Sequence, residues 1–187
     1  MNKLLVATLV ALAAATLDGC VVARATGQAV VTDVAPDNHL QVVVVPGIPQ
    51  DDGKNNLARI TGDKHMATLF PQLATRLPQD FKANGVDAAG VLLDVSAPVP
   101  APSATRTLVI RPTQAGYIER GGGSWLDLAV TLNDATHGVL WRGSIRMSTG
   151  TPADYDASAV DHAAVPLMEQ LRDARMIDIS WRRPTTP

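Results

Sequence analysis

Two adjacent segments with strict alternation constrain the fold of this chain more than any other feature. The first has apolar residues at every second position, namely Leu126, Leu128, Val130 and Leu132. The second repeats the pattern with Val139, Trp141, Ile145 and Met147. A period of two is typical of half-buried strands, and the segment 133–138 between them is rich in turn-forming residues. We therefore expect an antiparallel hairpin whose register is firm, because a one-residue slip would expose its apolar side chains.

Further strands are predicted on the N-terminal side of this hairpin. Residues 41–45 form a short β-branched run that is typical of a strand buried on both faces. Residues 91–95 and 106–110 are two more candidates, and 114–118 continues the latter past an irregularity at Pro112. The alternation of residues 177–181 is compatible with one more strand near the C-terminus.

Two segments carry the spacing of amphipathic helices. Residues 63–84 contain an apolar stripe formed by Met66, Phe70, Leu73, Leu77 and Phe81. Pro71 interrupts this segment, so we expect a kink or a restart there, with the proline in a first turn. The second helix is expected to open at Thr151-Pro152, and its apolar face is formed by Val160, Ala164, Leu167, Leu171 and Ala174.

The order of these elements predicts an α+β fold, with a mainly antiparallel sheet of four to five strands and two helices packed on one face. A chain of 187 residues is typical of one domain. Its 16 basic and 18 acidic residues leave a net charge of -2, which argues against a nucleic-acid partner.

The first twenty residues have the features of an export signal. Lys3 is followed by the uncharged, mostly apolar stretch 4–17, which is too short to span a bilayer and fits the apolar region of a signal peptide. Leu17-Asp18-Gly19-Cys20 then resembles the bacterial lipobox, although an acid at the Asp18 position departs from that pattern. The resemblance implies cleavage between Gly19 and Cys20 and acylation of Cys20. Cys20 is also the only cysteine, so an intramolecular disulfide is excluded.

These features divide the chain into three parts. Residues 1–19 are expected to be a lipoprotein signal peptide, 20–40 the lipidated N-terminus and tether, and 41–187 a single α+β domain. A first strand is the alternative for part of 21–40, where residues 29–32 could pair in a sheet. The lipid on Cys20 would attach the protein to a membrane of the bacterial envelope. Because Val21 follows Cys20, rather than the aspartate of an inner-membrane retention signal, the resemblance implies the outer membrane, with the domain facing the periplasm.

Together with the lipobox, the element order over about residues 40–180 resembles a group of small envelope lipoproteins. This group includes activators of penicillin-binding proteins, auxiliary lipoproteins of lipid transporters, and the curli-secretion and TolB amino-terminal domains. The resemblance implies a protein-interaction or accessory module of an envelope complex. It rests on no shared residue motif, so it transfers no functional residue to this chain.

The sequence contains few groupings that suggest chemistry. The four histidines, at positions 39, 65, 137 and 162, lack metal-ligand spacing, so we expect no metal site and no cofactor. The string Gly121-Gly122-Gly123-Ser124 is interpreted as a flexible hairpin connection, with a mobile recognition loop or a nucleophilic Ser124 as alternatives. Arg142 and Arg146 share one side of their strand, where they either pair with acids such as Asp127 or face an acidic partner.

Three hypotheses for the function follow. The first is a non-enzymatic envelope lipoprotein that contacts another envelope protein through Ser124, Arg142 and Arg146. The second is a lipoprotein that binds a small molecule or a lipid in an apolar groove between helix and sheet. The third is a hydrolase that uses Ser124 with a histidine.

Overall fold

The computed structural model describes residues 21–46, 68–94, 98, 106–118, 123–150 and 155–179. The proposed signal peptide and the cleavage site at Gly19 and Cys20 lie outside these ranges. In the described ranges, no helix combines the length and the apolar character needed to cross a bilayer.

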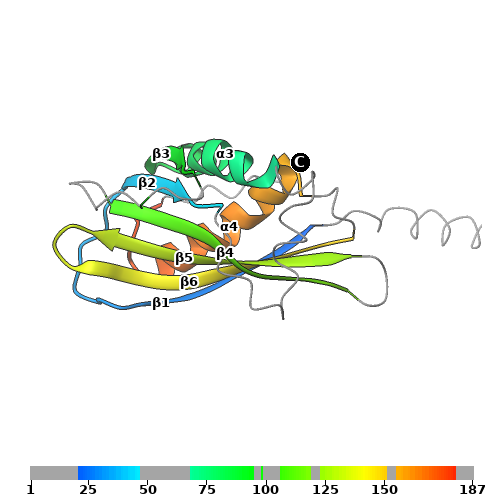
Figure 1. Cartoon of the computed structure of the whole chain (residues 1–187). Helices are drawn as coiled ribbons and strands as arrows, with labels where there is room; N and C mark the ends of the chain where they lie inside the picture. Colours follow the sequence, from blue (N-terminus) through cyan, green and yellow to red (C-terminus); the bar gives the residue numbers. More distant parts are fainter. Residues whose placement is uncertain are drawn as a thin grey trace, which may run out of the picture.

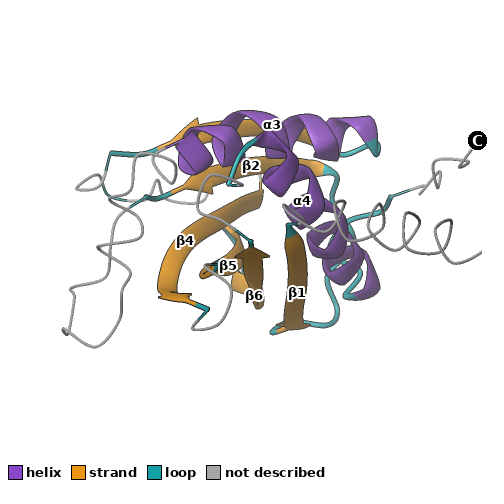
Figure 2. Ribbon diagram, turned by 90° about the vertical axis from the view of Figure 1, so that its right-hand side faces the viewer, coloured by secondary structure: helices purple, strands orange, loops and turns teal. Residues whose placement is uncertain are grey.

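The fold is α+β, with two helices on a six-stranded mixed sheet (Figure 1). The strands are β1 (Val22–Ala29), β2 (His39–Val44), β3 (Asp87–Leu92), β4 (Arg106–Tyr117), β5 (Ser124–Asp134) and β6 (Gly138–Thr149). The helices are α3 (Leu69–Ala83) and α4 (Ala157–Asp173). Both helices pack on one concave face of the sheet, around which the strands curve (Figure 2). The predicted class and the packing of the helices are confirmed, but the predicted count of four to five strands is wrong.

The strand order β1-β6-β5-β4-β2-β3 explains the difference in strand number. β1 pairs antiparallel with β6 along its whole length, so the segment 20–40 contains a first strand rather than only a tether, and that strand lies earlier than the 29–32 stretch suggested from the sequence. β2 pairs in parallel with both β3 and β4, which makes the sheet mixed rather than purely antiparallel. α3 connects β2 to β3, as a helical crossover between parallel strands requires.

The predicted β5–β6 hairpin is confirmed, with Leu128 opposite Ile145 and Leu132 opposite Trp141. Its alternation is interrupted by a register shift between Leu132 and Asn133, where Leu140 and Trp141 are both fully buried. β4 also contains the predicted irregularity, a register shift between Pro112 and Gln114. β3 begins four residues before the predicted segment 91–95. Residues 177–179 form no strand, although Ile177 and Ile179 are buried in the core, so their alternation reflects packing rather than pairing.

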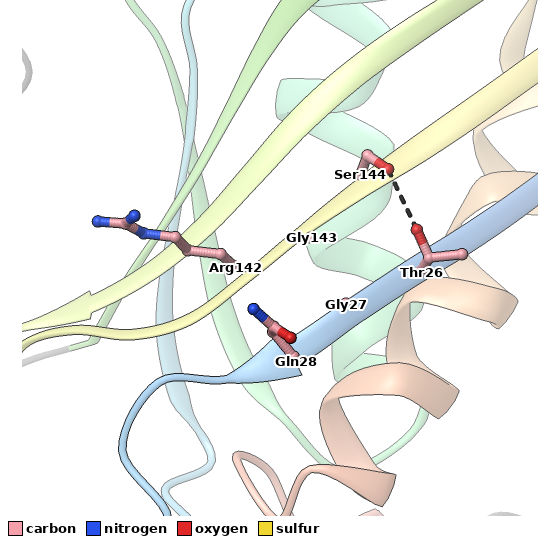
Figure 3. Close-up of a pocket in the computed structure, with 6 residues that line it drawn as sticks. All are labelled: Thr26, Gly27, Gln28, Arg142, Gly143 and Ser144. Atoms are coloured by element: carbon pink, nitrogen blue, oxygen red, sulfur yellow. Dashed lines mark hydrogen bonds between the residues drawn. The ribbon is translucent and has the colours of Figure 1, made fainter.

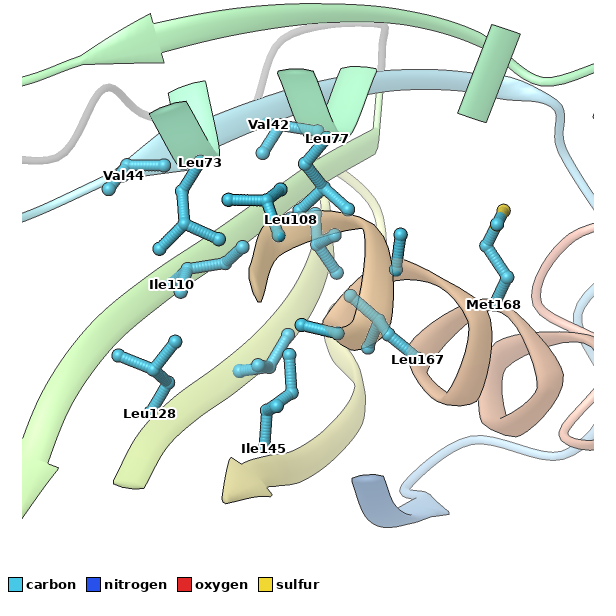
Figure 4. Close-up of a cluster of buried hydrophobic side chains, with 14 of the residues drawn as sticks. Val42, Val44, Leu73, Leu77, Leu108, Ile110, Leu128, Ile145, Leu167 and Met168 are labelled. Carbon is cyan, nitrogen blue, oxygen red and sulfur yellow. The ribbon is translucent and has the colours of Figure 1, made fainter. Parts of the chain in front are cut away.

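The core fills the space between the helices and the concave face of the sheet (Figure 4). Leu73 and Leu77 of α3 and Leu167 of α4 are fully buried, as are Leu128 and Ile145 of the sheet. Burying a side chain of this size stabilises the fold by about 1.5–3 kcal/mol. The predicted helical stripe is confirmed for the four members that lie in the described residues, which are Phe70, Leu73, Leu77 and Phe81.

The prolines are accommodated without breaking either helix. Pro71 lies in the first turn of α3, where the missing N–H has no helical acceptor, as predicted. Pro78 lies inside α3 and cannot donate to the carbonyl of Ala74. That carbonyl instead faces Gly90 of β3, where a Cβ would lie only 1.7 Å from the Ala74 oxygen. A glycine at position 90 therefore lets the helix approach the edge of the sheet.

α4 begins later than expected, at Ala157 rather than near Thr151. Its N-cap is Asp156, whose carboxylate accepts hydrogen bonds from the backbone N–H groups of Ser158 and Ala159. The side-chain hydrogen bond from Ser158 lowers the pKa of Asp156, and the backbone bonds reinforce this effect against burial. Arg76 of α3 donates to Asp161 of α4 and joins the two helices.

Candidate interaction face

The convex face of the sheet, opposite the helices, carries a polar surface over β1, β6, β5 and β4. Side chains in register across neighbouring strands share a face, so the pairing fixes the members of this surface. Its charged members are Arg24, Arg111, Asp127, Arg142 and Arg146. Between them lie short or uncharged side chains, including Thr26, Gln28, Trp125, Ala129, Thr131 and Ser144. We call this set of residues the open face.

The open face is strongly cationic relative to the whole chain. All four of its arginines are exposed, and Asp127 is the only acid in the set. The whole chain has a net charge of -2, so positive charge is concentrated on this side of the domain. Such a surface attracts anionic groups and speeds their association at low ionic strength.

Arg146 is fixed in place by its neighbours on β5. Its Nε and Nη2 atoms donate to the two carboxylate oxygens of Asp127 at 2.7 and 2.6 Å. The hydrogen bonds to Asp127 raise the pKa of Arg146. The guanidinium also lies 4.6 Å from the ring centre of Trp125. Trp125 in turn covers Gly116 of β4, where a Cβ would meet the indole at 2.6 Å. The predicted pairing of Arg146 with Asp127 is confirmed.

Arg142 and Arg24 are differently placed. Arg142 lies opposite Thr131 of β5 and Gln28 of β1, and within the described ranges it forms no ion pair. Figure 3 shows its guanidinium extending away from the hydroxyls of Thr26 and Ser144, which lie 3.2 Å apart. Arg24 lies directly opposite Arg146 in the β1–β6 register, and Asp127 offsets the charge of Arg146, whereas Arg24 forms no ion pair with a described residue. These two arginines are therefore available to a partner.

Trp141 packs against the backbone of β1 and β6 from the concave side, opposite the open face. This indole is fully buried on the concave side, across the paired glycines Gly27 and Gly143. A Cβ would lie 1.9 Å from the ring at Gly27 and 2.2 Å at Gly143. Glycine at both positions lets the ring lie flat against β1 and β6, which holds the edge strand on the sheet.

Ser124 does not belong to the surface on which it was predicted. It is the first residue of β5, is 0% exposed, and its Oγ lies 3.3 Å from Oγ1 of Thr149. The hydroxyl of Tyr155 lies in the same buried cluster. Burial raises the pKa of Tyr155, and its hydrogen bonds with Ser124 and Thr149 offset part of that increase. The predicted surface role of Ser124 is therefore wrong, and its hydroxyl contacts Thr149 rather than a histidine, so the nucleophile alternative gains no support. Gly121 and Gly122 lie outside the described residues.

The histidines are dispersed in the structure. His39 begins β2 and lies 3.0 Å from Asp37, whereas His137 lies in the β5–β6 turn, 2.9 Å from Asp134. His162 is on the exposed side of α4, and its ring nitrogen contacts the carbonyl of Ser158. His65 is not among the described residues. In the part of the chain that the structure describes, no group of three or more histidine, cysteine or acidic side chains is arranged to hold a metal ion.

Sequence reasoning identified Arg142 and Arg146 but missed Arg24, Arg111 and Trp125 as members of the open face. Residues 24, 26 and 28 do alternate with the small residues Ala23, Ala25 and Gly27, which is the signal that could have revealed β1. Small residues give a weak strand signal because they carry little apolar surface.

Comparison with known proteins assigns this chain to no family. No protein-family model matches the chain, and no curated protein matches it. Among solved structures, the PelC dodecamer from Paraburkholderia phytofirmans is similar at a TM-score of 0.44 and 15% identity, over 85% of this chain and 99% of that chain. A variant of the same dodecamer matches at a TM-score of 0.43 and 15% identity, over 84% of this chain and 98% of that chain. We draw no functional conclusion from this likeness, and the proposals below rest on the geometry of the open face.

Proposed function

We propose that this protein is a lipid-anchored envelope lipoprotein that acts without catalysis, as an interaction or accessory module that binds another envelope protein. The open face is its binding surface, and the partner presents an acidic surface to it. The signal segment and the lipobox-like sequence before Cys20 support a periplasmic location at a membrane, and Val21 after Cys20 favours the outer membrane.

The single observation that carries this proposal is the asymmetry of the sheet. One face is covered by both helices, whereas the other presents four arginines with one aspartate. Arginine is the residue most suited to bidentate recognition of carboxylates. Arg142 and Arg24 form no ion pair with any described residue, so their charges are not already neutralised within the fold.

The alternative functions have less support. A lipid-binding module needs an apolar groove between helix and sheet, but the side chains that line this layer, such as Leu77, Ile110 and Leu167, are fully buried against one another. A serine hydrolase needs an accessible nucleophile, which Ser124 is not. Native mass spectrometry of the unlipidated domain separates ligand binding from our proposal, because a co-purifying ligand would favour the second function.

Affinity purification from detergent-solubilised envelopes tests the proposal. The test variant is Arg111→Glu/Arg142→Glu, which reverses two charges of the open face that no described residue pairs with. The matched control is Lys82→Glu/Arg175→Glu, which changes the net charge equally at two exposed positions, one at the end of α3 and one just after α4. Arg146 is left intact because its contacts with Asp127 and Trp125 stabilise the sheet.

We expect the native protein and the helix-side control to retain one stoichiometric partner, identified by mass spectrometry, and the open-face variant to lose most of it. Circular dichroism checks that both variants are folded. Equal recovery of the partner with all three proteins would show that the open face is not the binding surface. The absence of any partner from the native sample would remove the proposed function itself.

A further inference from the structure

The start of β1 leaves almost no chain between the proposed lipid and the folded domain. Val21 is 4% exposed and belongs to the main hydrophobic core, and β1 begins at Val22. Cys20 is joined to Val21 by one peptide bond, and neighbouring Cα atoms are about 3.8 Å apart. An acyl chain on Cys20 would therefore hold this end of the sheet against the bilayer, rather than at the end of a long tether.

The strand register shows which residues lie at that end. Val22 of β1 is opposite Ser148 of β6, which is opposite Trp125 of β5, which is opposite Gly116 of β4. This row spans four strands, or about 14 Å at the usual spacing between strands. The end of β4 and the start of β5 therefore lie at the same end of the molecule as the start of β1 (Figure 1).

Apolar and aromatic side chains are exposed at this end. The side chains of Val22, Tyr117 and Ile118 are 49%, 40% and 43% exposed, and they make up half of the large hydrophobic residues that are exposed in the described ranges. Trp125, in the same row as Val22, is half-buried. Tyrosine and tryptophan favour the membrane–water interface, where an apolar ring and a polar atom are both satisfied.

Two cations lie in the next row. Arg24 and Arg146 are opposite each other on β1 and β6, one register step of two residues from Val22 and Ser148. A lipid phosphate near these guanidinium groups would relieve the repulsion between them. Their long apolar stems also allow arginines to cover apolar surface while the charge stays at the headgroup level.

From this arrangement we infer that the end of the domain formed by Val22, Tyr117, Ile118 and Trp125, with Arg24 and Arg146 behind them, lies directly on the bilayer surface and contacts anionic phospholipid headgroups. This inference rests on the proposed acylation of Cys20 and goes beyond it by fixing the orientation of the domain. The remainder of the open face, around Arg142, stays accessible to a protein partner.

Depth-dependent fluorescence quenching in vesicles tests this orientation. The acylated protein is purified from envelopes and reconstituted in vesicles of phosphatidylethanolamine and phosphatidylglycerol that contain a headgroup-level nitroxide lipid. A nitrobenzoxadiazole label is attached at Tyr117→Cys, or at Ile118→Cys as a second position. The control position is Thr136→Cys in the β5–β6 turn, at the opposite end of the sheet. Since Cys20 is the only native cysteine, the introduced thiol is the only one open to labelling once Cys20 is acylated.

We expect the labels at 117 and 118 to lose most of their fluorescence and the label at 136 to lose almost none. Arg24→Gln should weaken the quenching at 118 because one headgroup contact is removed, and the difference from the native arginine should shrink at high salt, which screens that contact. Equal quenching at both ends, on protein whose mass shows an acylated Cys20, would overturn the orientation while leaving the anchor and the proposed function in place. An unmodified Cys20 in the purified protein would overturn both the anchor and the orientation.

Discussion

The two faces of this sheet are built from the same strands but differ in the burial and polarity of their side chains. On the concave face, Leu128, Val130 and Ile145 are fully buried beneath the helices, and their identity is set by packing. On the convex face, the residues that alternate with them are half-buried or exposed, and they include Asp127, Ala129 and Arg146.

The contrast indicates that the concave face determines the stability of the domain, whereas the open face is suited to recognition. Close packing makes the concave face intolerant of changes in volume. The open face contributes little to stability except through the contacts of Arg146, so its arginines need another explanation. Mutations on one face or the other should therefore differ in their effect on stability, and the largest effects are expected on the concave face.

Leu128→Ala should produce the largest loss of stability. The side chain is 0% exposed between α4 and the sheet, and its removal should lower the free energy of unfolding by about 2–5 kcal/mol. The neighbouring change Ala129→Ser, on the open face, should alter it by less than about 0.5 kcal/mol. Urea unfolding followed by circular dichroism measures both values. Similar losses for the two variants would show that the faces are not distinct.

Gly143→Ala should have the next largest effect, because it adds a methyl group where none fits. The new Cβ would lie 2.2 Å from the Trp141 ring and 2.3 Å from the carbonyl oxygen of Thr26. Overpacking of this kind should lower the free energy of unfolding by about 1–3 kcal/mol. Ser144→Ala, one residue along and on the open face, is the control and should be nearly neutral in thermal denaturation. A neutral Gly143→Ala would mean that Trp141 does not pack against β6 in solution.

The coupling between Arg146 and Asp127 should be small but measurable. A double-mutant cycle with Arg146→Ala and Asp127→Ala should give an interaction free energy of about 0.5–1 kcal/mol, because the pair is bidentate yet its arginine is largely exposed. The coupling should fall as salt is raised. Arg142→Ala should change stability by less than about 0.5 kcal/mol. A cost for Arg142→Ala as large as that for Arg146→Ala would contradict the view that Arg142 is free for a partner.

Acid should weaken the fold through the carboxylate that caps α4. The pKa of Asp156 is lowered from 3.8, chiefly by the hydrogen bond from the side chain of Ser158. A lowered folded-state pKa means that this carboxylate contributes stability above pH 3.8 and that the contribution is lost as the pH falls below it. Asp156→Asn keeps a capping oxygen but not the charge, so its unfolding free energy should depend less on pH in this acid range. Parallel pH profiles for the two proteins would argue against the cap.

The elements that sequence reasoning predicted correctly are those whose pattern is set by one buried face. The β5–β6 hairpin has a clear alternation, and α3 has an apolar stripe. The position of β1 was missed because Ala23, Ala25 and Gly27 bury little surface, although Trp141 packs over that strand. Parallel pairing of β2 was not predicted, although a continuous apolar run such as 42–45 is typical of strands in parallel sheets.

The candidate site was only partly predictable for the same reason. Alternation within β6 placed Arg142 and Arg146 on one side, and the Asp127 pairing followed from the hairpin register. Arg24 and Arg111 join them through strand pairings that are remote in sequence. Ser124 was misassigned because a glycine-rich neighbourhood indicates a loop, whereas its hydroxyl is buried against Thr149.

Site-specific photo-crosslinking in living cells tests most directly whether the open face binds an envelope protein. A photoreactive amino acid replaces Ser144, at the centre of the open face, or Glu169, on the exposed side of α4. Our account predicts one discrete crosslinked envelope protein from position 144 and none from position 169. Crosslinks to such a protein from position 169 alone, or equally from both positions, would contradict it.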